Sequence, residues 1–261
     1  LNFPVRSKIY WQPLGVVGII SPWNYPIDLT ISPLVYALAT GNRVMIKPSE
    51  HTPKTSELLE KLISKYFELE HVAVCCGDVE TGIEFSKLPF DHLMFTGSTK
   101  TGKLVMSEAA KNLTPVTLEL GGKSPTIIGP DANIPSAARR ICFGKSINSG
   151  QTCIAPDYIF IQKNKVQQFV TEYRKSFEKM YPEGEQDQGY SCLINKFHFE
   201  RINNLILDAK EKGARVEEIG KWSNLEKMGP HFVFDTTQEM DISQTEIFGP
   251  LLPIITYNDI S

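Results

Sequence analysis

Cysteine is scarce in this sequence, and its spacing suits neither a metal site nor a disulfide framework. Five of the 261 residues are cysteines, namely Cys75, Cys76, Cys142, Cys153 and Cys192. The number is odd and no Cys-x-x-Cys or Cys-x-x-His pair is present, so we expect no metal site. Free thiols in a reducing compartment explain the pattern better than disulfides. No signal peptide stands at the start of the sequence, which is Leu1, and we expect a cytoplasmic protein.

Long apolar runs and an excess of charge are also missing. A membrane helix needs ~18–20 apolar residues in succession, whereas the longest candidates, Leu14–Ile20 and Leu251–Ile255, have the length of strands. The net charge of −3 gives no support for nucleic acid or an anionic membrane surface as a partner. We therefore expect a globular protein without a membrane segment and without a nucleic-acid partner.

What the sequence does contain is an alternation of short apolar runs with stretches of helical periodicity. The expected strands of the first half are Val16–Ile20, Val44–Ile46, Val72–Cys75, Leu93–Phe95 and Val116–Leu118. The expected helices are Ile27–Ala39, Ser56–Phe67, Thr101–Lys111 and Ile134–Ile147. Apolar stripes over residues 166–180 and 199–209 predict two more helices, the second ended by Gly213, and Gly184–Gly189 reads as a loop. This alternation predicts a doubly wound α/β fold, in which ligands bind at the carboxyl ends of parallel strands.

Cys153 is the first candidate for chemistry. It follows the glycine-containing stretch Ser149–Gly150–Gln151–Thr152 at the end of an expected helix. Backbone N–H groups near such a turn can lower the pKa of a thiol and make it a nucleophile. A buried structural cysteine is the better interpretation of a lone cysteine, because free cysteine is among the most buried residue types.

Further polar residues follow expected strands. Glu119 precedes Gly121–Gly122, where a carboxylate can act in acid–base chemistry, although a solvated loop glutamate is the simpler interpretation. Gly97 and Ser98 lie between a strand and a helix, where backbone N–H groups suit a phosphate, and an ordinary strand–helix turn is the alternative.

Further polar residues are candidates for binding a ribose or stabilising an oxyanion. Lys47 can hold ribose hydroxyls or a phosphate, and Glu50 can accept hydrogen bonds from an adenosine ribose, although Ser49–Glu50 as the start of a solvated helix is the alternative. Asn24, within Ser21–Pro26, can donate to an oxyanion, although asparagine is also common in turns. Glu246 precedes a Gly-Pro turn and has a loop glutamate as its alternative interpretation.

Taken in order, these stretches resemble the aldehyde dehydrogenase family. They are Pro-Trp-Asn at 22–24, Lys-Pro-Ser-Glu at 47–50, Phe-Thr-Gly-Ser at 95–98, Glu-Leu-Gly-Gly-Lys at 119–123, Gly-Gln-Thr-Cys at 150–153 and Glu-Ile-Phe-Gly-Pro at 246–250. Residues 112–119 and 150–158 look like the class 3 branch, and residues 88–98 look most like bacterial coniferyl aldehyde dehydrogenases. The resemblance covers nearly the whole chain.

The resemblance implies roles for individual residues. Cys153 resembles the nucleophile that forms a thiohemiacetal and then a thioester, Asn24 the oxyanion donor and Glu119 the base that activates water. The residues that resemble cofactor contacts are Trp23, Lys47, Glu50, Gly97, Ser98, Glu246 and Phe248. The implied activity is oxidation of an aldehyde, such as coniferyl or another aromatic or aliphatic aldehyde, to its acid with NAD or NADP.

The resemblance also implies an organisation. We expect two doubly wound α/β domains, a cofactor-binding domain over residues 1–121 and a catalytic domain over residues 122–261. Related chains run further at both ends, so both domains look truncated, and related proteins suggest a homodimer. The alternatives are an acylating relative, against which Glu119 argues, and a non-catalytic protein on the same fold, against which Cys153, Glu119 and Asn24 argue.

Overall fold

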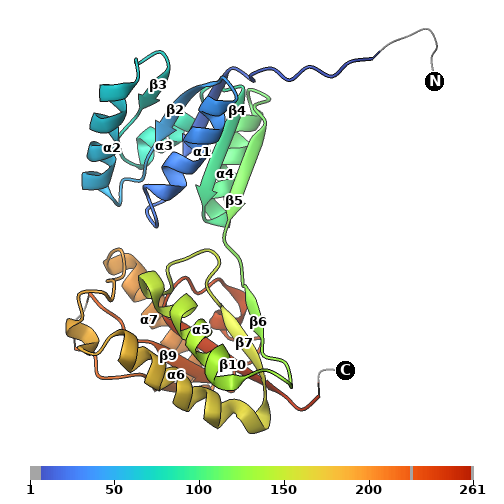
Figure 1. The fold of residues 1–261 in the computed structure, drawn as a ribbon, viewed down its shortest axis with the longest axis vertical. Coiled ribbons are helices and arrows are strands. Elements are labelled where there is room, and N and C mark those ends of the chain that lie inside the picture. Colours follow the sequence, from blue (N-terminus) through green and yellow to red (C-terminus); the bar gives the residue numbers. More distant parts are fainter. Residues whose placement is uncertain (1–6, 224–225, 260–261) are drawn as a thin grey trace. The chain divides into compact units, whose positions relative to one another are not determined.

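The computed structural model describes residues 7–223 and 226–259 of the chain. They divide into two compact units, residues 1–120 and residues 121–261 (Figure 1). Among the described residues, none of the helices combines the length and the apolar character that a membrane crossing needs.

The first unit is built around a five-stranded parallel sheet. Its elements are β1 (Val16–Ile20), α1 (Asp28–Ala39), β2 (Arg43–Lys47), α2 (Pro53–Tyr66), β3 (Val72–Val74), α3 (Val79–Ser86), β4 (His92–Gly97), α4 (Thr99–Ala110) and β5 (Val116–Leu120). The strand order is β3-β2-β1-β4-β5, with every neighbouring pair parallel. Because the order reverses on either side of β1, the helices fall on both faces of the sheet.

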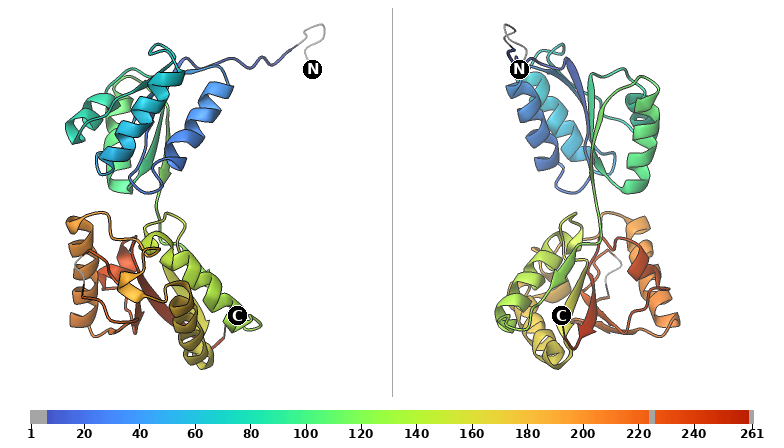
Figure 2. Two further views of the ribbon diagram at one scale, coloured as in Figure 1. Left: turned by 60° about the vertical axis from the view of Figure 1, so that its left-hand side comes forward. Right: turned by 90° about the vertical axis from the view of Figure 1, so that its right-hand side faces the viewer.

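Two apolar clusters fill the two faces of this sheet. Val17, Ile19 and Ile46 pack with Leu34 of α1 and Ile63 of α2 on one face. The other face carries a cluster that reaches into α3 and α4 and consists of Phe85, Phe90, Leu93, Phe95, Val105 and Ala109. Figure 2 shows α1 and α2 on one side of the sheet and α4 on the other. The doubly wound arrangement expected from the sequence is confirmed in this unit.

The second unit contains a five-stranded mixed sheet. Its strands are β6 (Pro125–Ile127), β7 (Tyr158–Gln162), β8 (Arg215–Glu218), β9 (His231–Phe234) and β10 (Leu251–Tyr257). Its helices are α5 (Ile134–Ser146), α6 (Val166–Met180), α7 (Lys196–Glu211) and α8 (Asp241–Gln244), and short 3-10 turns lie at Ile147–Gly150, Lys163–Lys165 and Gly184–Gln186. The order is β6-β7-β10-β9-β8, and only the pairing of β8 with β9 is antiparallel. An antiparallel edge strand on an otherwise parallel sheet is common in doubly wound folds.

Alternate residues of the central strands face the two layers of helices in this unit. Phe232 and Phe234 of β9 join a cluster with α5 and α6, whereas Val233 between them joins a cluster with α7 and α8. All four clusters lie within one unit or the other, so each unit has a core of its own.

The expected helices are confirmed, with shifts of a few residues at their ends. α2 begins three residues before the expected Ser56, because Pro53 occupies its first turn, where a missing N–H costs nothing. α4 begins at Thr99 because the hydroxyl of Ser98 accepts a hydrogen bond from the Thr101 N–H and caps the helix. Gly213 follows the end of α7 with a φ of +95°, as its expected capping role requires.

Candidate active site

The candidate residues of the first unit lie along one edge of its sheet. Lys47 and Gly97 are the last residues of β2 and β4, and Glu119 is the last but one of β5. Asn24 lies in the turn that follows β1. Because these strands are parallel neighbours, their carboxyl ends share one edge. The structure therefore brings these candidates to the end of the sheet where doubly wound folds bind their ligands.

The turn after β1 holds Asn24 in a buried position. Asn24 is 7% exposed, and Tyr25 beside it has a φ of +47°. The hydroxyl of Thr30 bonds to the Pro26 carbonyl oxygen at 2.6 Å and to the Ser21 hydroxyl at 2.7 Å. The first turn of α1 thus fastens the loop on both sides of Asn24. A fixed side-chain amide can donate to an oxyanion without first being reorganised.

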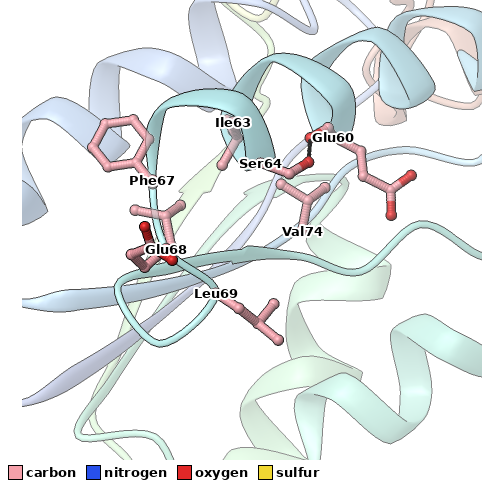
Figure 3. A pocket seen from close by; sticks show the side chains of 8 residues that line it. Glu60, Ile63, Ser64, Phe67, Glu68, Leu69 and Val74 are labelled. Carbon is pink, nitrogen blue, oxygen red and sulfur yellow. Dashed lines mark hydrogen bonds between the residues drawn. The ribbon is translucent and has the colours of Figure 1, made fainter.

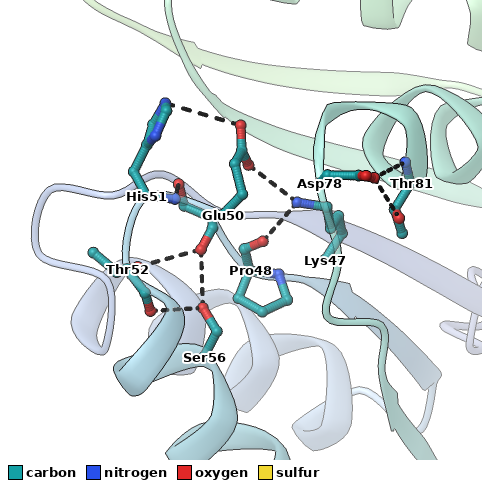
Figure 4. A network of polar contacts seen from close by, with 9 residues as sticks. Lys47, Pro48, Glu50, His51, Thr52, Ser56, Asp78 and Thr81 are labelled. Carbon is teal, nitrogen blue, oxygen red and sulfur yellow. Dashed lines mark hydrogen bonds and ion pairs between the residues drawn. The ribbon is translucent and has the colours of Figure 1, made fainter. Parts of the chain in front are cut away.

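Lys47 and Glu50 form one polar network (Figure 4). The Lys47 ammonium is 3% exposed, and it donates to the Pro48 carbonyl at 2.8 Å and to the Glu50 carboxylate at 3.2 Å. His51 Nε2 lies 3.9 Å from the other oxygen of Glu50. Partial burial raises the pKa of Glu50, but its own backbone N–H and Lys47 outweigh burial, so the pKa is lowered overall. Glu50 is held as a carboxylate, an acceptor that suits ribose hydroxyls.

Gly97 and Ser98 make a close turn into α4. A Cβ atom on Gly97 would come within 2.6 Å of the Phe95 ring, so the position accepts only glycine without a shift. Ser98 caps the helix, and the first N–H groups of α4 follow directly. Such a cradle, backed by a helix N-terminus, fits the pyrophosphate of a dinucleotide.

Glu119 is an exposed residue of β5 that faces Thr96 across the pair of strands. It lines a groove of about 490 Å³ between α1 and the sheet, together with residues such as Ser32, Tyr36 and His92. Its accessibility to solvent is compatible with the activation of a water molecule.

A second hollow lies elsewhere in the first unit. It measures about 330 Å³ and lies between α2 and β3 (Figure 3). Its lining consists of Glu60, Ile63, Ser64, Phe67, Glu68, Leu69, Val72 and Val74. None of the site residues expected from the sequence is among them.

Cys153 in the second unit follows a turn of unusual backbone conformation. Asn148, Ser149 and Gly150 have φ values of +50°, +53° and +73°. A left-handed conformation costs a non-glycine residue about 1–2 kcal/mol, so the surroundings must impose it. Cys153 itself is half-buried rather than enclosed in the core.

The buried amide of Gln151 fixes this turn. Its Nε2 donates to the carbonyls of Asn148 at 2.9 Å and Cys192 at 3.1 Å, and its Oε1 accepts from the Ile194 N–H at 2.9 Å. The Ser149 hydroxyl donates to the Ser191 carbonyl. The sequence identified Gln151 only as part of a motif, because two of its three partners, Cys192 and Ile194, lie some 40 residues further along the chain. These bonds hold the segment before Cys153 rigid, as a positioned nucleophile requires.

Glu246 and Phe248 lie in the loop before β10. Glu246 Oε1 accepts a hydrogen bond from the Gly122 N–H at 3.1 Å, which links this loop to the Gly-Gly stretch expected from the sequence. Burial raises the pKa of Glu246, and the negative charge of Asp157 adds to that effect, whereas the Gly122 N–H, Arg201 and Lys123 counteract it. Phe248 has a φ of +47°. Across the described ranges, no three His, Cys, Asp or Glu side chains gather in a way that suits a metal ion.

Comparisons with known proteins agree with the motifs. The sequence pattern of the "Aldehyde dehydrogenase family" matches residues 4–261. The "Probable coniferyl aldehyde dehydrogenase" of Pseudomonas aeruginosa is 48% identical over 254 residues, which are 97% of this chain and 53% of that protein. The "Aldehyde dehydrogenase, dimeric NADP-preferring" of Mus musculus is 45% identical over 249 residues, which are 95% of this chain and 54% of that protein.

A solved structure is similar over the same length. The aldehyde dehydrogenase of Mycobacterium tuberculosis in complex with NAD+ matches with a TM-score of 0.85 and 31% identity, over 95% of this chain and 53% of that one. The chain spans about half the length of the curated relatives that it matches. The family pattern, the relatives and the solved structure agree, and the chain belongs to the aldehyde dehydrogenase family.

Proposed function

We propose that this chain carries the central chemistry of an NAD(P)-dependent aldehyde dehydrogenase, which oxidises an aldehyde to its carboxylic acid. The observation that carries the proposal is the half-buried Cys153 thiol, which follows a turn fixed by the buried Gln151 in a chain that belongs to this family. The first unit then serves as the cofactor-binding domain and the second as the catalytic domain.

The first half of the reaction oxidises the aldehyde on Cys153. The thiolate of Cys153 attacks the carbonyl carbon, and a new C–S bond turns the carbonyl oxygen into an oxyanion. The Asn24 amide and the Cys153 backbone N–H donate to that oxyanion. Bound NAD+ or NADP+ supplies the acceptor for the hydride that the tetrahedral adduct releases. A thioester on Cys153 remains.

The second half hydrolyses the thioester. Glu119 takes a proton from a water molecule, whose oxygen attacks the thioester carbon. The C–S bond then breaks, the acid leaves and the Cys153 thiolate is restored. The exposure of Glu119 on β5 supports this role, since water reaches the carboxylate directly.

The cofactor contacts are assigned by unit. Lys47 and Glu50 hold the adenosine ribose, and Gly97 and Ser98 hold the pyrophosphate. Trp23, Glu246 and Phe248 complete the cofactor contacts, with Glu246 on the nicotinamide ribose. The ionised Glu50 repels a 2′-phosphate and so favours NAD+, although a relative named as NADP-preferring shows that NADP+ is used within the family.

Substrate, assembly and location follow from the relatives and the composition. The similarity to a protein named as a coniferyl aldehyde dehydrogenase supports an aromatic aldehyde as substrate. A relative named as dimeric supports a homodimer. The low and odd number of cysteines supports a cytoplasmic location.

The decisive experiment measures NADH formation at 340 nm with coniferyl aldehyde, benzaldehyde and hexanal. Turnover is expected with at least one aldehyde and is expected to vanish in Cys153→Ser, because a hydroxyl is a far weaker nucleophile than a thiolate. NADH binding should be retained in that variant. Substantial turnover by Cys153→Ser would refute the role of Cys153. Turnover that requires an added thiol as acyl acceptor would instead identify an acylating enzyme.

A further inference from the structure

The guanidinium of Arg201 on α7 binds backbone carbonyls of the loop that carries Glu246. Its guanidinium donates to the carbonyl oxygens of Glu246 at 3.3 Å, Ile247 at 2.6 Å and Phe248 at 3.4 Å. Burial lowers the pKa of Arg201, against the opposing effect of Glu246 and Asp157. A partly buried guanidinium that binds three successive carbonyls fixes the path of the backbone rather than pairing with one carboxylate.

Lys123 and Asp157 bind further backbone groups of the same loop. The Lys123 ammonium donates to the carbonyls of Ile242 at 2.9 Å and Thr245 at 3.0 Å, and it forms an ion pair with Asp157. Asp157 is 3% exposed, and its second oxygen accepts from the Ile247 N–H at 2.9 Å. Both residues belong to motifs that the sequence singled out, yet neither has a part in the proposed chemistry.

Three charged side chains thus bind six backbone groups between residues 242 and 248. Burying a charged side chain costs desolvation free energy, which is offset only where its ion pairs and hydrogen bonds have good geometry. The loop needs such support, because Phe248 has a φ of +47°, a conformation that a residue with a side chain rarely adopts unaided. The three side chains hold a strained path that the loop would not keep by itself.

We propose that Lys123, Asp157 and Arg201 are positioning residues for the nicotinamide half of the cofactor. They set the backbone of Glu246–Phe248, and through it the Glu246 carboxylate and the Phe248 ring. The inference rests on the proposed function, since it assumes that Glu246 and Phe248 contact the cofactor. None of the three touches the reacting atoms in this scheme, so their loss acts through the loop.

The proposal separates the two halves of the dinucleotide. Lys47 and Glu50, which are proposed to bind the adenosine ribose, belong to the first unit, whereas the loop belongs to the second. Loosening the loop should therefore weaken binding of NADH, which has both halves, and leave binding of AMP, which has only the adenosine half, unchanged.

The test compares Arg201→Met, Arg201→Lys and Asp157→Asn with a matched control, Arg174→Met. Arg174 lies on α6, where it pairs with Glu217 at 3.0 Å, and it makes no bond to residues 242–248. Dissociation constants for NADH and for AMP are measured on the purified protein, together with hydrogen exchange of the peptides that cover residues 242–250.

Arg201→Met should weaken NADH binding by about tenfold or more, because hydrogen bonds to a charged donor are lost from the loop. It should leave the AMP constant within about twofold and speed exchange at 246–248. Arg201→Lys should recover part of the affinity, since an ammonium can still serve one or two carbonyls. Asp157→Asn keeps an acceptor for Ile247 and should have a smaller effect. It also provides a mild variant if Arg201→Met fails to fold.

Two results would overturn the inference. One is an equal loss of NADH and AMP binding, which would mean general destabilisation. The other is exchange at 246–248 that is no faster in the Arg201 variants than in Arg174→Met. If the unsubstituted protein binds neither nucleotide, the proposed cofactor site fails, whereas the exchange data still decide whether these side chains hold the loop.

Discussion

Lys145 is a buried ammonium group to which the proposed chemistry gives no role. It lies in the last turn of α5 and is 1% exposed. Burial lowers the pKa of Lys145 to about 8, despite the attraction of Asp157. The unfolded chain takes up this proton near pH 10.5, whereas the folded protein takes it up only near pH 8. The folded state therefore loses stability as the pH falls from about 10.5 to 8, and the full loss applies below pH 8.

Lys145→Met should therefore stabilise the protein at neutral pH. The gain in the free energy of unfolding is about 3 kcal/mol at pH 7, and it shrinks to about 1 kcal/mol at pH 10, where the folded lysine is already neutral. Urea denaturation of both proteins at the two pH values measures the difference. Lys179→Met, on the exposed face of α6, serves as the control and should show no such pH dependence. A gain that is equal at pH 7 and pH 10 would contradict the explanation by burial of a charge.

For single residues, the sequence predicts the place in a strand or helix better than it predicts side-chain contacts. Lys47 ends β2 as expected, because an apolar run followed by proline marks a strand end directly, whereas β4 runs two residues past the expected Phe95 and ends at Gly97. The bonds of Arg201 could not be predicted, since its partners lie about 45 residues away and helical periodicity does not say which charged residue reaches a loop. The chemical roles of Cys153 and Glu119 stay predictions.

The turn Ile147–Gly150 is the element on which the placement of Cys153 depends. A Cβ atom on Gly150 would lie 2.4 Å from the Gly249 carbonyl oxygen and 3.0 Å from the Lys145 carbonyl oxygen, and φ at this position is +73°. Both neighbours are backbone atoms, so a side chain here is accommodated only if the turn itself moves.

Gly150→Ala should lower the free energy of unfolding by at least about 3 kcal/mol, through a left-handed alanine and a backbone clash. Gly184→Ala is the matched control, because Gly184 has a φ of +57° but nothing within 4 Å of its Cβ position, and about 1 kcal/mol is expected there. Urea denaturation gives both values. Similar losses in the two variants would show that the close approach of Gly249 does not matter.

Some helices and strands were not predicted, because the sequence signals for them were short or mixed. α3 (Val79–Ser86) was not predicted, because Gly82 in its middle lowers helical propensity by about 1 kcal/mol. The helix forms because the Asp78 side chain accepts from the Thr81 N–H and because Phe85 is buried. β7 (Tyr158–Gln162) was not predicted either.

For the chain as a whole, the separate cores of the two units predict separate unfolding. Ile46 of β2 and Ile161 of β7 are both fully buried, one in each unit. Replacing either with alanine removes the same atoms and costs about 2–5 kcal/mol. The two substitutions therefore form a matched pair that differs only in the core affected.

Scanning calorimetry should show two transitions, with Ile46→Ala lowering one midpoint and Ile161→Ala the other. NAD+ at a hundredfold excess over its dissociation constant stabilises whatever binds it by about 2.7 kcal/mol. Because Lys47, Glu50, Gly97 and Ser98 all lie in the first unit and only Glu246 and Phe248 lie in the second, NAD+ should raise the midpoint that Ile46→Ala lowers more than the midpoint that Ile161→Ala lowers. A rise confined to the transition lowered by Ile161→Ala would place the cofactor in the second unit. A single transition that both substitutions shift equally would mean that the two cores unfold together.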